Sequence, residues 1–384
     1  MKQNNVRLFL LGGAVLLLLF ALLLPSVGPA PTLLGDTVSP SAALHLSAAL
    51  VHGEAAQLRL HGIQPGVTFT LSGSDAEHVY HTRFRNSPFA NGGLCLYQLP
   101  AAVYAVYADG RRIDASLLND SLPQGYTLPR DGLRKHWQFR TDRHGLLELV
   151  IRDTEHLPAG YFDVAIDAGH GGGDLGAEAG GEQEAQLNLE NSLLLKSYLE
   201  AYGLRVFLTR EDAALPGGMA AEENPYLPNA RIDLIYRSHA SYLISNHLNA
   251  GNGQQAGFQI YSSVASDLRF ATAVADALLA AGAVANDSGS GLVASGLYQR
   301  HSEEPGGYGR DYYFILRETG GAALSPTLYL YHNPQMADAI QRGPEALLME
   351  YAFLDNAADR NAWLQQRETL LQATAAGAAA YWQL

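Results

Sequence analysis

Residues 161–173 read YFDVAIDAGHGGG, and this stretch points to the fold class. A strongly apolar run such as YFDVAIDA is typical of a buried strand, and the glycines after His170 let the backbone pass close to a ligand. A helix is expected next, over residues 187–202, with leucines along one face and Gly203 at the position of a C-terminal cap. A strand that leads directly into a helix is the repeating unit of an α/β domain.

The same alternation continues to the last residue. Further strands are expected at 204–209, 242–247, 257–262, 312–316 and 346–351, and further helices over 266–281 and 361–382. Because the strands are apolar runs, we expect a mostly parallel sheet with helices covering both faces. Residues 158–384 are therefore predicted to form one α/β domain whose chemistry gathers at the strand ends.

Polar side chains occupy such positions four times. His170 ends the first strand, and Glu184 comes just before the first helix. His247 ends the strand at 242–247, and Glu350 lies near the end of the last one. A lone carboxylate in an apolar strand costs free energy unless it is paired or used, so Glu350 is a candidate functional residue.

Two histidines and a carboxylate are the ligand set of a catalytic zinc ion, with the fourth position open to water. Zinc lowers the pKa of that water to about 7, and Glu350 could take its proton. The chain has no Gly-x-Ser-x-Gly elbow to suggest a nucleophilic serine instead. These residue types alone leave two simpler readings open, a packed histidine and a carboxylate that merely starts a helix.

The region before the α/β domain has a different pattern. Residues 42–157 contain short runs rich in aromatic and branched side chains, separated by turn signals such as Asp109-Gly110 and His144-Gly145. This spacing predicts a small all-β, sandwich-like domain. Its histidines lack metal-ligand spacing, and its role is not evident from the sequence.

The first residues indicate the compartment. Lys2 and Arg7 precede an apolar stretch from Leu8 to Leu24, which Pro25 ends. We expect residues 1–25 to form an apolar helix that anchors the chain in the membrane or serves as a cleaved signal segment. The rest would lie outside the cytoplasm, tethered to the cell membrane or else secreted or periplasmic. Residues 26–41, rich in Pro, Gly and small residues, are predicted to be a linker.

Charge and cysteine content exclude other classes. The formal net charge is -13, and there is no run of Lys or Arg that could supply the basic face needed to bind nucleic acid. The single cysteine, Cys95, excludes an internal disulfide and a thiolate-rich metal site.

Five motifs occur in the order typical of one enzyme family. They are FDVAIDAGHGGGDLGA, EAQLNL, RIDLIYRSHASYLISNHLNA, GRDYYFILRET and EALLMEYAFLDN, and the resemblance that they carry covers residues 162 to about 382. The chain resembles the zinc-dependent N-acetylmuramoyl-L-alanine amidases of the amidase-3 type. The resemblance implies that His170, Glu184 and His247 bind one zinc ion and that Glu350 is the catalytic carboxylate.

The resemblance also implies a substrate and a reaction. The substrate would be peptidoglycan, cut at the amide between N-acetylmuramic acid and L-alanine during cell-wall remodelling or lysis. Asn188 and Asn249 are candidates to support a metal ligand by hydrogen bonding. Arg231 and Arg310, from the matching arginine-containing segments, are candidates for the same role or for binding substrate.

The chain departs from the family pattern at four places, the first of which is Ala168, where a proline is usual. Asn246 stands where an apolar residue is usual before the third ligand, and Tyr351-Ala352 follow Glu350 in place of an apolar residue and glycine. The Tyr351 side chain could change the shape of the cleft. Residues 320–344 read as an insertion just before the last strand, either a lid or substrate wall or a solvent loop.

Two other functions remain compatible with the sequence. A zinc peptidase that cuts within the stem peptide would need the same water activation beside a peptide cleft. A non-catalytic, wall-binding regulator is the second alternative, although such a protein has no need of all four site residues. The sequence does not identify a protein regulator.

Overall fold

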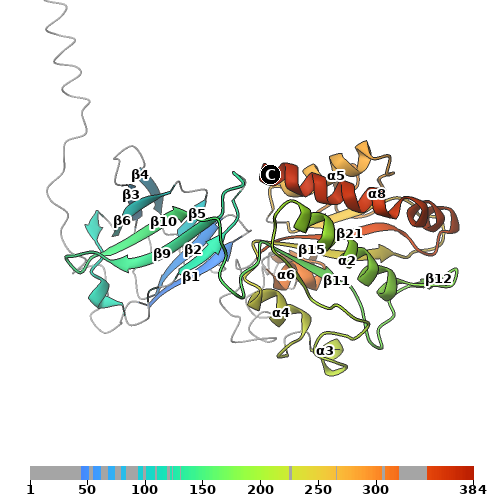
Figure 1. Cartoon of the computed structure of the whole chain (residues 1–384), viewed down its shortest axis with the longest axis horizontal. Coiled ribbons are helices and arrows are strands. Elements are labelled where there is room, and N and C mark those ends of the chain that lie inside the picture. Colours follow the sequence, from blue (N-terminus) through green and yellow to red (C-terminus); the bar gives the residue numbers. More distant parts are fainter. Residues whose placement is uncertain are drawn as a thin grey trace, which may run out of the picture.

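The structure is a computed structural model of the whole chain, shown in Figure 1. It describes residues 45–51, 55–61, 68–73, 79–83, 94–97, 101–319 and 344–384, apart from short gaps at 109, 119–121, 123, 130, 225–226, 265 and 305–307. Only the backbone is described for the strands before Leu71, for residues 79–83 and 94–97, and for the described part of 303–310.

The described strands before residue 154 pair only in antiparallel fashion. A three-stranded sheet has the order β1 (His45–Val51), β2 (Ala55–His61), β5 (Leu94–Tyr97). A seven-stranded sheet has the order β4 (Val79–Arg83), β3 (Thr68–Gly73), β6 (Ala102–Ala108), β10 (Leu147–Asp153), β9 (Lys135–Thr141), β8 (Gln124–Thr127), with β7 (Arg111–Arg112) beside β6. A short 3₁₀ helix, η1 (Ala115–Leu117), joins β7 to β8.

The remainder of the chain is built on a second seven-stranded sheet. Its order is β14 (Val206–Leu208), β11 (Val164–Ala168), β15 (Tyr242–Asn249), β21 (Glu345–Phe353), β16 (Gln259–Ser262), β18 (Leu297–Tyr298), β17 (Leu292–Ala294). The first four strands run parallel to one another. Their carboxyl ends therefore meet at one edge, which is where ligands bind in α/β sheets.

The sheet is mostly parallel, as expected, but it is mixed, because two of its pairings are antiparallel. Strand β16 runs antiparallel to β21, and β17 runs antiparallel to β18. The physical reason is the short connection over residues 250–258, which carries no crossover helix. Two consecutive strands can run parallel only when a connection of a dozen or more residues carries the chain back to the starting edge of the sheet. The connection from β15 to β16 is shorter, so β16 runs in the opposite direction to β15.

Helices cover both faces of this sheet (Figure 1). One face carries α2 (Glu184–Ala201), α5 (Arg269–Ala280) and α8 (Ala357–Trp382), whose apolar side chains share a core with the sheet. The other face carries α4 (Arg231–Arg237) and α6 (Phe314–Glu318). The smaller elements are β12 (Glu178–Ala179), β13 (Glu182–Gln183), α3 (Ala220–Glu223), β19 (His301–Glu304) and β20 (Tyr308–Asp311).

The strand predicted at 312–316 is wrong, because helix α6 begins at Phe314. A short apolar run cannot by itself distinguish a strand from a buried helical turn. Here Ile315 and Leu316 enter the core beneath α4, and the Thr319 hydroxyl donates to the Ile315 carbonyl four residues earlier. Packing against the sheet, rather than local preference, selects the helical turn.

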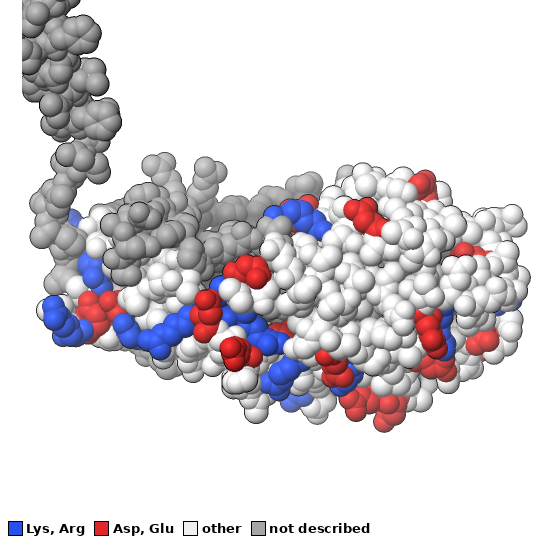
Figure 2. All heavy atoms as spheres, turned by 45° about the horizontal axis from the view of Figure 1, so that its top comes forward, with Lys and Arg blue, Asp and Glu red and all other residues white. Residues whose placement is uncertain are grey.

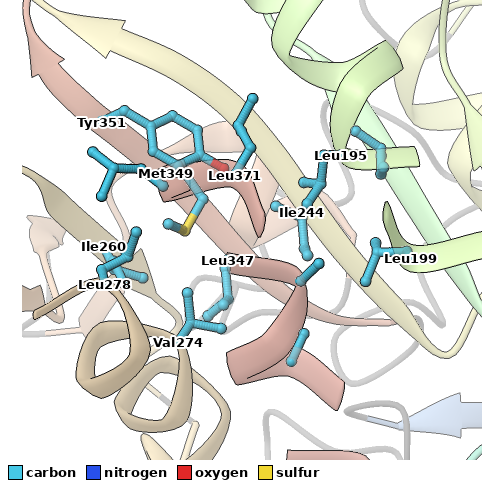
Figure 3. Close-up of a cluster of buried hydrophobic side chains, with 14 of the residues drawn as sticks. Leu195, Leu199, Ile244, Ile260, Val274, Leu278, Leu347, Met349, Tyr351 and Leu371 are labelled. Carbon is cyan, nitrogen blue, oxygen red and sulfur yellow. The ribbon is translucent and has the colours of Figure 1, made fainter. Parts of the chain in front are cut away.

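The larger core lies between the sheet and helices α2, α5 and α8 (Figure 3). Leu347, Met349 and Tyr351 alternate along β21, so all three side chains point to this face. Leu348 and Glu350 consequently point to the opposite face, where α4 and α6 pack and where the cleft opens. The period of two along β21 thus separates core residues from site residues.

Contacts cross the boundary predicted at residue 158. The segment after β8 places Leu128 in the core of the α/β part, and the Leu128 N–H donates to Ser241 Oγ at 3.0 Å. Arg134 forms two 2.8 Å hydrogen bonds to Asp163, which lies directly before β11. The two parts of the chain are therefore packed together at the amino-terminal edge of the parallel strands.

Figure 2 shows a broad area with few charged side chains on the half of the molecule that carries α5 and α8. Among the described residues, no helix combines the length and apolar character needed to cross a membrane. The predicted anchor at 1–25 and linker at 26–41 lie outside the described residues, as does nearly all of the insertion at 320–344.

Candidate metal centre

A cleft of about 930 Å³ opens at the carboxyl ends of the parallel strands. His170 follows β11, His247 lies near the end of β15, and Glu350 lies near the end of β21. Glu184, the first residue of α2, reaches the same cleft from the helix side. Of the predicted site residues, these four and also Arg231 and Asn249 line the cleft.

Glu184 is held as a carboxylate anion at the start of α2. Its Oε2 accepts from the Ala177 N–H at 2.9 Å, and its Oε1 accepts from the Leu248 N–H at 3.1 Å. The side chain is 4% exposed, and burial alone would raise the pKa of its carboxyl. The facing rings of His170 and His247 outweigh burial and lower that pKa well below its usual value.

His170 is held in an unusual backbone conformation. Its φ is +61°, in the left-handed region that a residue with a Cβ enters at a cost of about 1–3 kcal/mol. Its Nδ1 lies 2.7 Å from Asp174 Oδ2, which leaves Nε2 facing Glu184 Oε1 at 3.1 Å. Burial would lower the pKa of His170, but the carboxylates of Glu184 and Asp174 raise it. A carboxylate behind a ligating histidine fixes the ring and increases its basicity.

His247 completes the group from β15. Its Nδ1 lies 3.0 Å from Glu184 Oε1, and its ring centroid is 5.0 Å from that of His170. The ring occupies the space in front of Gly169, where a Cβ would lie only 2.3 Å from His247 Nε2. Any side chain at position 169 would therefore displace the histidine.

The donor set fits a single zinc ion. The ligand atoms of His170, Glu184 and His247 all lie within 4.8 Å of one another. Ligand atoms about 2.0–2.2 Å from a tetrahedral ion lie roughly 3.3–3.5 Å apart, close to the two N···O distances of 3.0 and 3.1 Å. One carboxylate and two imidazoles suit zinc and leave a coordination position for water.

Glu350 lies beside this group in the cleft. It is 8% exposed, and its Oε2 is buried without a hydrogen-bond partner among the described residues. Burial, assisted by the negative charge of Glu184, raises the pKa of Glu350 well above its usual value. A carboxyl that is neither ion-paired nor locked in hydrogen bonds can exchange a proton with a neighbouring group.

Two arginines hold the backbone of residues 168–170, which we call the metal loop. Arg231 pairs with the buried Asp167 and donates to the carbonyl of His170 at 2.8 Å. Arg210 donates to the carbonyls of Ala168 and Gly169 at 3.0 and 2.9 Å. Burial and the charge of Arg231 lower the pKa of Arg210 to about 10. Both guanidinium groups are thus committed to the protein, which favours a positioning role for Arg231.

The two predicted asparagines also contact the protein. Asn188, which is fully buried, donates from Nδ2 to Glu184 Oε1 at 3.2 Å. Asn249 donates from Nδ2 to Gln259 Oε1 at 2.7 Å, and its carbonyl accepts from the Leu354 N–H. Asn188 therefore supports a candidate ligand directly, whereas Asn249 joins the cleft ends of β15, β16 and β21.

Arg310 lies in β20, of which only the backbone is described at this position, so its role stays a prediction.

Tyr351 does not shape the cleft. It is 4% exposed, its ring stacks on that of Trp363 at 4.6 Å, and its hydroxyl donates to Asn246 Oδ1 at 3.0 Å. Two of the departures from the family pattern, Asn246 and Tyr351, are therefore bonded to each other inside the core.

Sequence reasoning missed two carboxylates. Asp174 lies four residues after His170, and the glycines between them allow the chain to turn back so that the two side chains meet. Asp167 is a charged residue within an apolar strand, which is the same signal that drew attention to Glu350. The partner of Asp167, Arg231, is 64 residues away, so only the folded chain reveals the pair.

The comparisons with known proteins agree with this geometry. The family described as N-acetylmuramoyl-L-alanine amidase matches residues 164–380, which is more than half of the chain. The chain belongs to this amidase family. The match includes all three candidate ligands and Glu350 and excludes the strand-rich region before β11.

Two curated amidases are similar over part of the chain. The N-acetylmuramoyl-L-alanine amidase CwlM of Bacillus licheniformis is 35% identical over 100 residues, which cover 26% of this chain and 35% of that protein. A germination-specific N-acetylmuramoyl-L-alanine amidase of Bacillus subtilis (strain 168) is 37% identical over 99 residues, which cover 24% of this chain and 41% of that protein. The chain thus spans well under half the length of these relatives.

Solved amidase structures are also similar. The CwlD amidase from Clostridioides difficile, solved in complex with the GerS lipoprotein, has a TM-score of 0.40 and 22% identity, and covers 58% of this chain and 96% of its own. The catalytic domain of CwlV, from Bacillus (Paenibacillus) polymyxa, has a TM-score of 0.38 and 21% identity. The match covers 57% of this chain and 96% of the CwlV domain.

Proposed function

We propose that this protein hydrolyses the amide between N-acetylmuramic acid and L-alanine in peptidoglycan, with one zinc ion held by His170, Glu184 and His247. The observation that carries the proposal is the convergence of these three side chains with the unpaired carboxyl of Glu350 in one cleft. Membership of the amidase family supports the choice of bond.

Zinc in this site would polarise the scissile carbonyl and lower the pKa of a bound water. The side chains supply the remaining steps. Glu350 takes a proton from the attacking water as the carbon–oxygen bond forms, and gives it to the L-alanine nitrogen as the carbon–nitrogen bond breaks. Glu184, Asn188 and Asp174 keep the ligand set in place while the proton moves.

The proposal is tested by digesting purified sacculi with the full-length, zinc-loaded protein. New amino-terminal L-alanine, detected by end-group labelling, is the expected product. The Glu350→Gln variant should bind zinc normally and release the product about 10²–10⁴ times more slowly. Retention of full activity by this variant would remove Glu350 from the mechanism.

The same digest separates the alternatives. New amino termini elsewhere in the stem peptide would identify a zinc peptidase and exclude the amidase. Binding to sacculi without any new terminus, in protein shown to contain zinc, would identify a wall-binding regulator. Glu350 Oε2, which has no hydrogen-bond partner in the described part of the chain, disfavours the regulator, because a binding module gains nothing from a buried polar atom left without one.

We further propose that the enzyme works outside the cytoplasm, with residues 1–25 as a membrane anchor or cleaved signal and 26–41 as a linker. In this proposal residues 42–157 are an all-β, sandwich-like domain and 158–384 the catalytic domain. Fractionation of cells that produce the protein with a C-terminal tag tests the anchor. Tag in the membrane fraction, resistant to high salt, supports it, whereas release into the medium supports cleavage.

A further inference from the structure

One pair of buried polar side chains lies behind the metal site, on the core face of the sheet. Asn246 is fully buried and directly precedes His247, while Tyr351 directly follows Glu350. The Tyr351 hydroxyl donates to Asn246 Oδ1 at 3.0 Å, and Asn246 Nδ2 donates to Ser192 Oγ of α2 at 2.8 Å. Tyr351 also belongs to the hydrophobic core drawn in Figure 3, beside Met349 and Leu371.

The pair joins the two strands that carry His247 and Glu350. His247 on β15 and Glu350 on β21 face each other across the parallel ladder, and this is its last regular step, because the register shifts between His247 and Asn249. Side chains alternate along a strand, so Asn246 and Tyr351 lie on the opposite face, Asn246 one step before the His247–Glu350 pair and Tyr351 one step after it. A slip of one residue would move His247 and Glu350 to the wrong face.

An apolar pair would fill this space without the cost of burying an amide and a phenol. Here every polar atom of the pair has a partner, and the ring of Tyr351 is held against Trp363 of α8. Such satisfied polar contacts in a core restrict it to one arrangement, because any shift leaves a buried donor or acceptor unpaired. The contact therefore limits movement of β15 against β21 and α2.

We propose that Asn246 and Tyr351 are positioning residues that hold His247 in register with Glu350 for zinc binding and proton transfer. The inference rests on the function proposed above. Ser192 extends the contact to α2, the helix that begins at Glu184. One chain of hydrogen bonds thus relates the elements that supply two zinc ligands and the catalytic carboxylate.

The test compares three full-length variants for zinc affinity, measured by competition with a chelator, and for kcat and KM. Tyr351→Phe leaves the Asn246 carbonyl without its donor, so the zinc Kd should rise about 10- to 100-fold and kcat should fall with little change in KM. In Asn246→Leu/Tyr351→Phe both groups that bond to each other are gone, so the unfolding midpoint should recover towards the wild-type value, less the contact that Ser192 loses, while zinc affinity and kcat stay low.

Tyr381→Phe is the matched control. The Tyr381 hydroxyl donates to Glu345 Oε2 at the other end of β21, at 3.1 Å. This variant should lose stability but keep the zinc affinity and kcat of the wild type. If Tyr351→Phe does not fold, the double variant carries the test.

Wild-type zinc affinity and kcat in the double variant would overturn the inference and leave the proposed function intact. A wild-type protein that binds no zinc and releases no amino-terminal L-alanine would overturn the function itself.

Discussion

Two aspartates on one stretch of chain bind arginines for different purposes. Asp167, within β11, pairs with Arg231 under the metal loop, and Asp163, just before β11, pairs with Arg134 at the junction with the strand-rich region. Both carboxylates are 1% exposed. The Arg231 side chain is 9% exposed and that of Arg134 is 19% exposed.

The difference lies in what else each pair holds. Arg231 also donates to the carbonyls of Ala168 and His170, so it fixes the backbone of a candidate zinc ligand. Arg134 instead donates to the carbonyls of Glu155 and Gly203, at the opposite end of the strand. Similar chemistry thus holds the candidate metal site at the carboxyl edge of the sheet and the junction with the strand-rich region at its amino edge.

The largest expected effect is that of Arg231→Ala. It leaves Asp167 buried without its cation, which should cost about 3–5 kcal/mol in the free energy of unfolding. Release of the His170 carbonyl should also weaken zinc binding at least tenfold. Denaturant unfolding and chelator competition measure the two effects, and unchanged zinc affinity would place Arg231 outside the metal site.

The counterpart, Arg134→Ala, should cost less, about 1.5–3 kcal/mol. Arg134 is more exposed, and the Arg205 N–H still donates to Asp163 Oδ2 at 2.7 Å. Zinc affinity and kcat of the folded protein should stay at the wild-type level, because the pair lies at the other edge of the sheet. A loss of zinc affinity like that of Arg231→Ala would show that the two pairs are coupled.

Acid tests the charge of Asp167 in its pair with Arg231. Burial would raise its pKa, but Arg231 and the hydroxyls of Ser245 and Thr209 lower it below the unfolded value of about 3.9. A lowered folded pKa contributes stability above the unfolded pKa, and that contribution is lost as the pH falls through the folded one.

The metal-free Asp167→Asn variant should therefore lose less stability than the wild type when the pH is lowered from about 4 to 2. Each unit by which the Asp167 pKa is shifted corresponds to about 1.4 kcal/mol of this difference. Urea unfolding at several pH values provides the slopes, and equal slopes would contradict the assignment.

The smallest effect concerns a single hydrogen bond at the junction. Ser241→Ala removes the acceptor of the buried Leu128 N–H and should cost about 1 kcal/mol. Ser197→Ala, on the exposed side of α2, is the control and should change stability by less than about 0.5 kcal/mol. Equal effects of the two substitutions would show that Leu128 gains nothing from this contact.

The sequence predicted the α/β fold and the positions of the four central site residues, because strand ends and unusual polar residues are local signals. The predictions from sequence failed where the direction of a strand or the packing of a segment against the sheet determines its structure. The reversal of β16 follows from a short loop, and the helix at Phe314 follows from packing of Ile315 and Leu316 against the sheet. The partners of Asp167 and Asp163 were also out of reach, because both arginines are distant in sequence.

The sequence by itself predicted the types of the candidate ligands, their order and the elements that carry or precede them, since these predictions depend on residue identity, periodicity and motif order. Only the tertiary structure decided which polar residues meet. It brought Asp174 behind His170, turned Tyr351 away from the cleft towards Asn246, and placed Leu128 in the core of the α/β part. Burial makes each of these contacts costly to leave unsatisfied, and burial is a property of the folded chain.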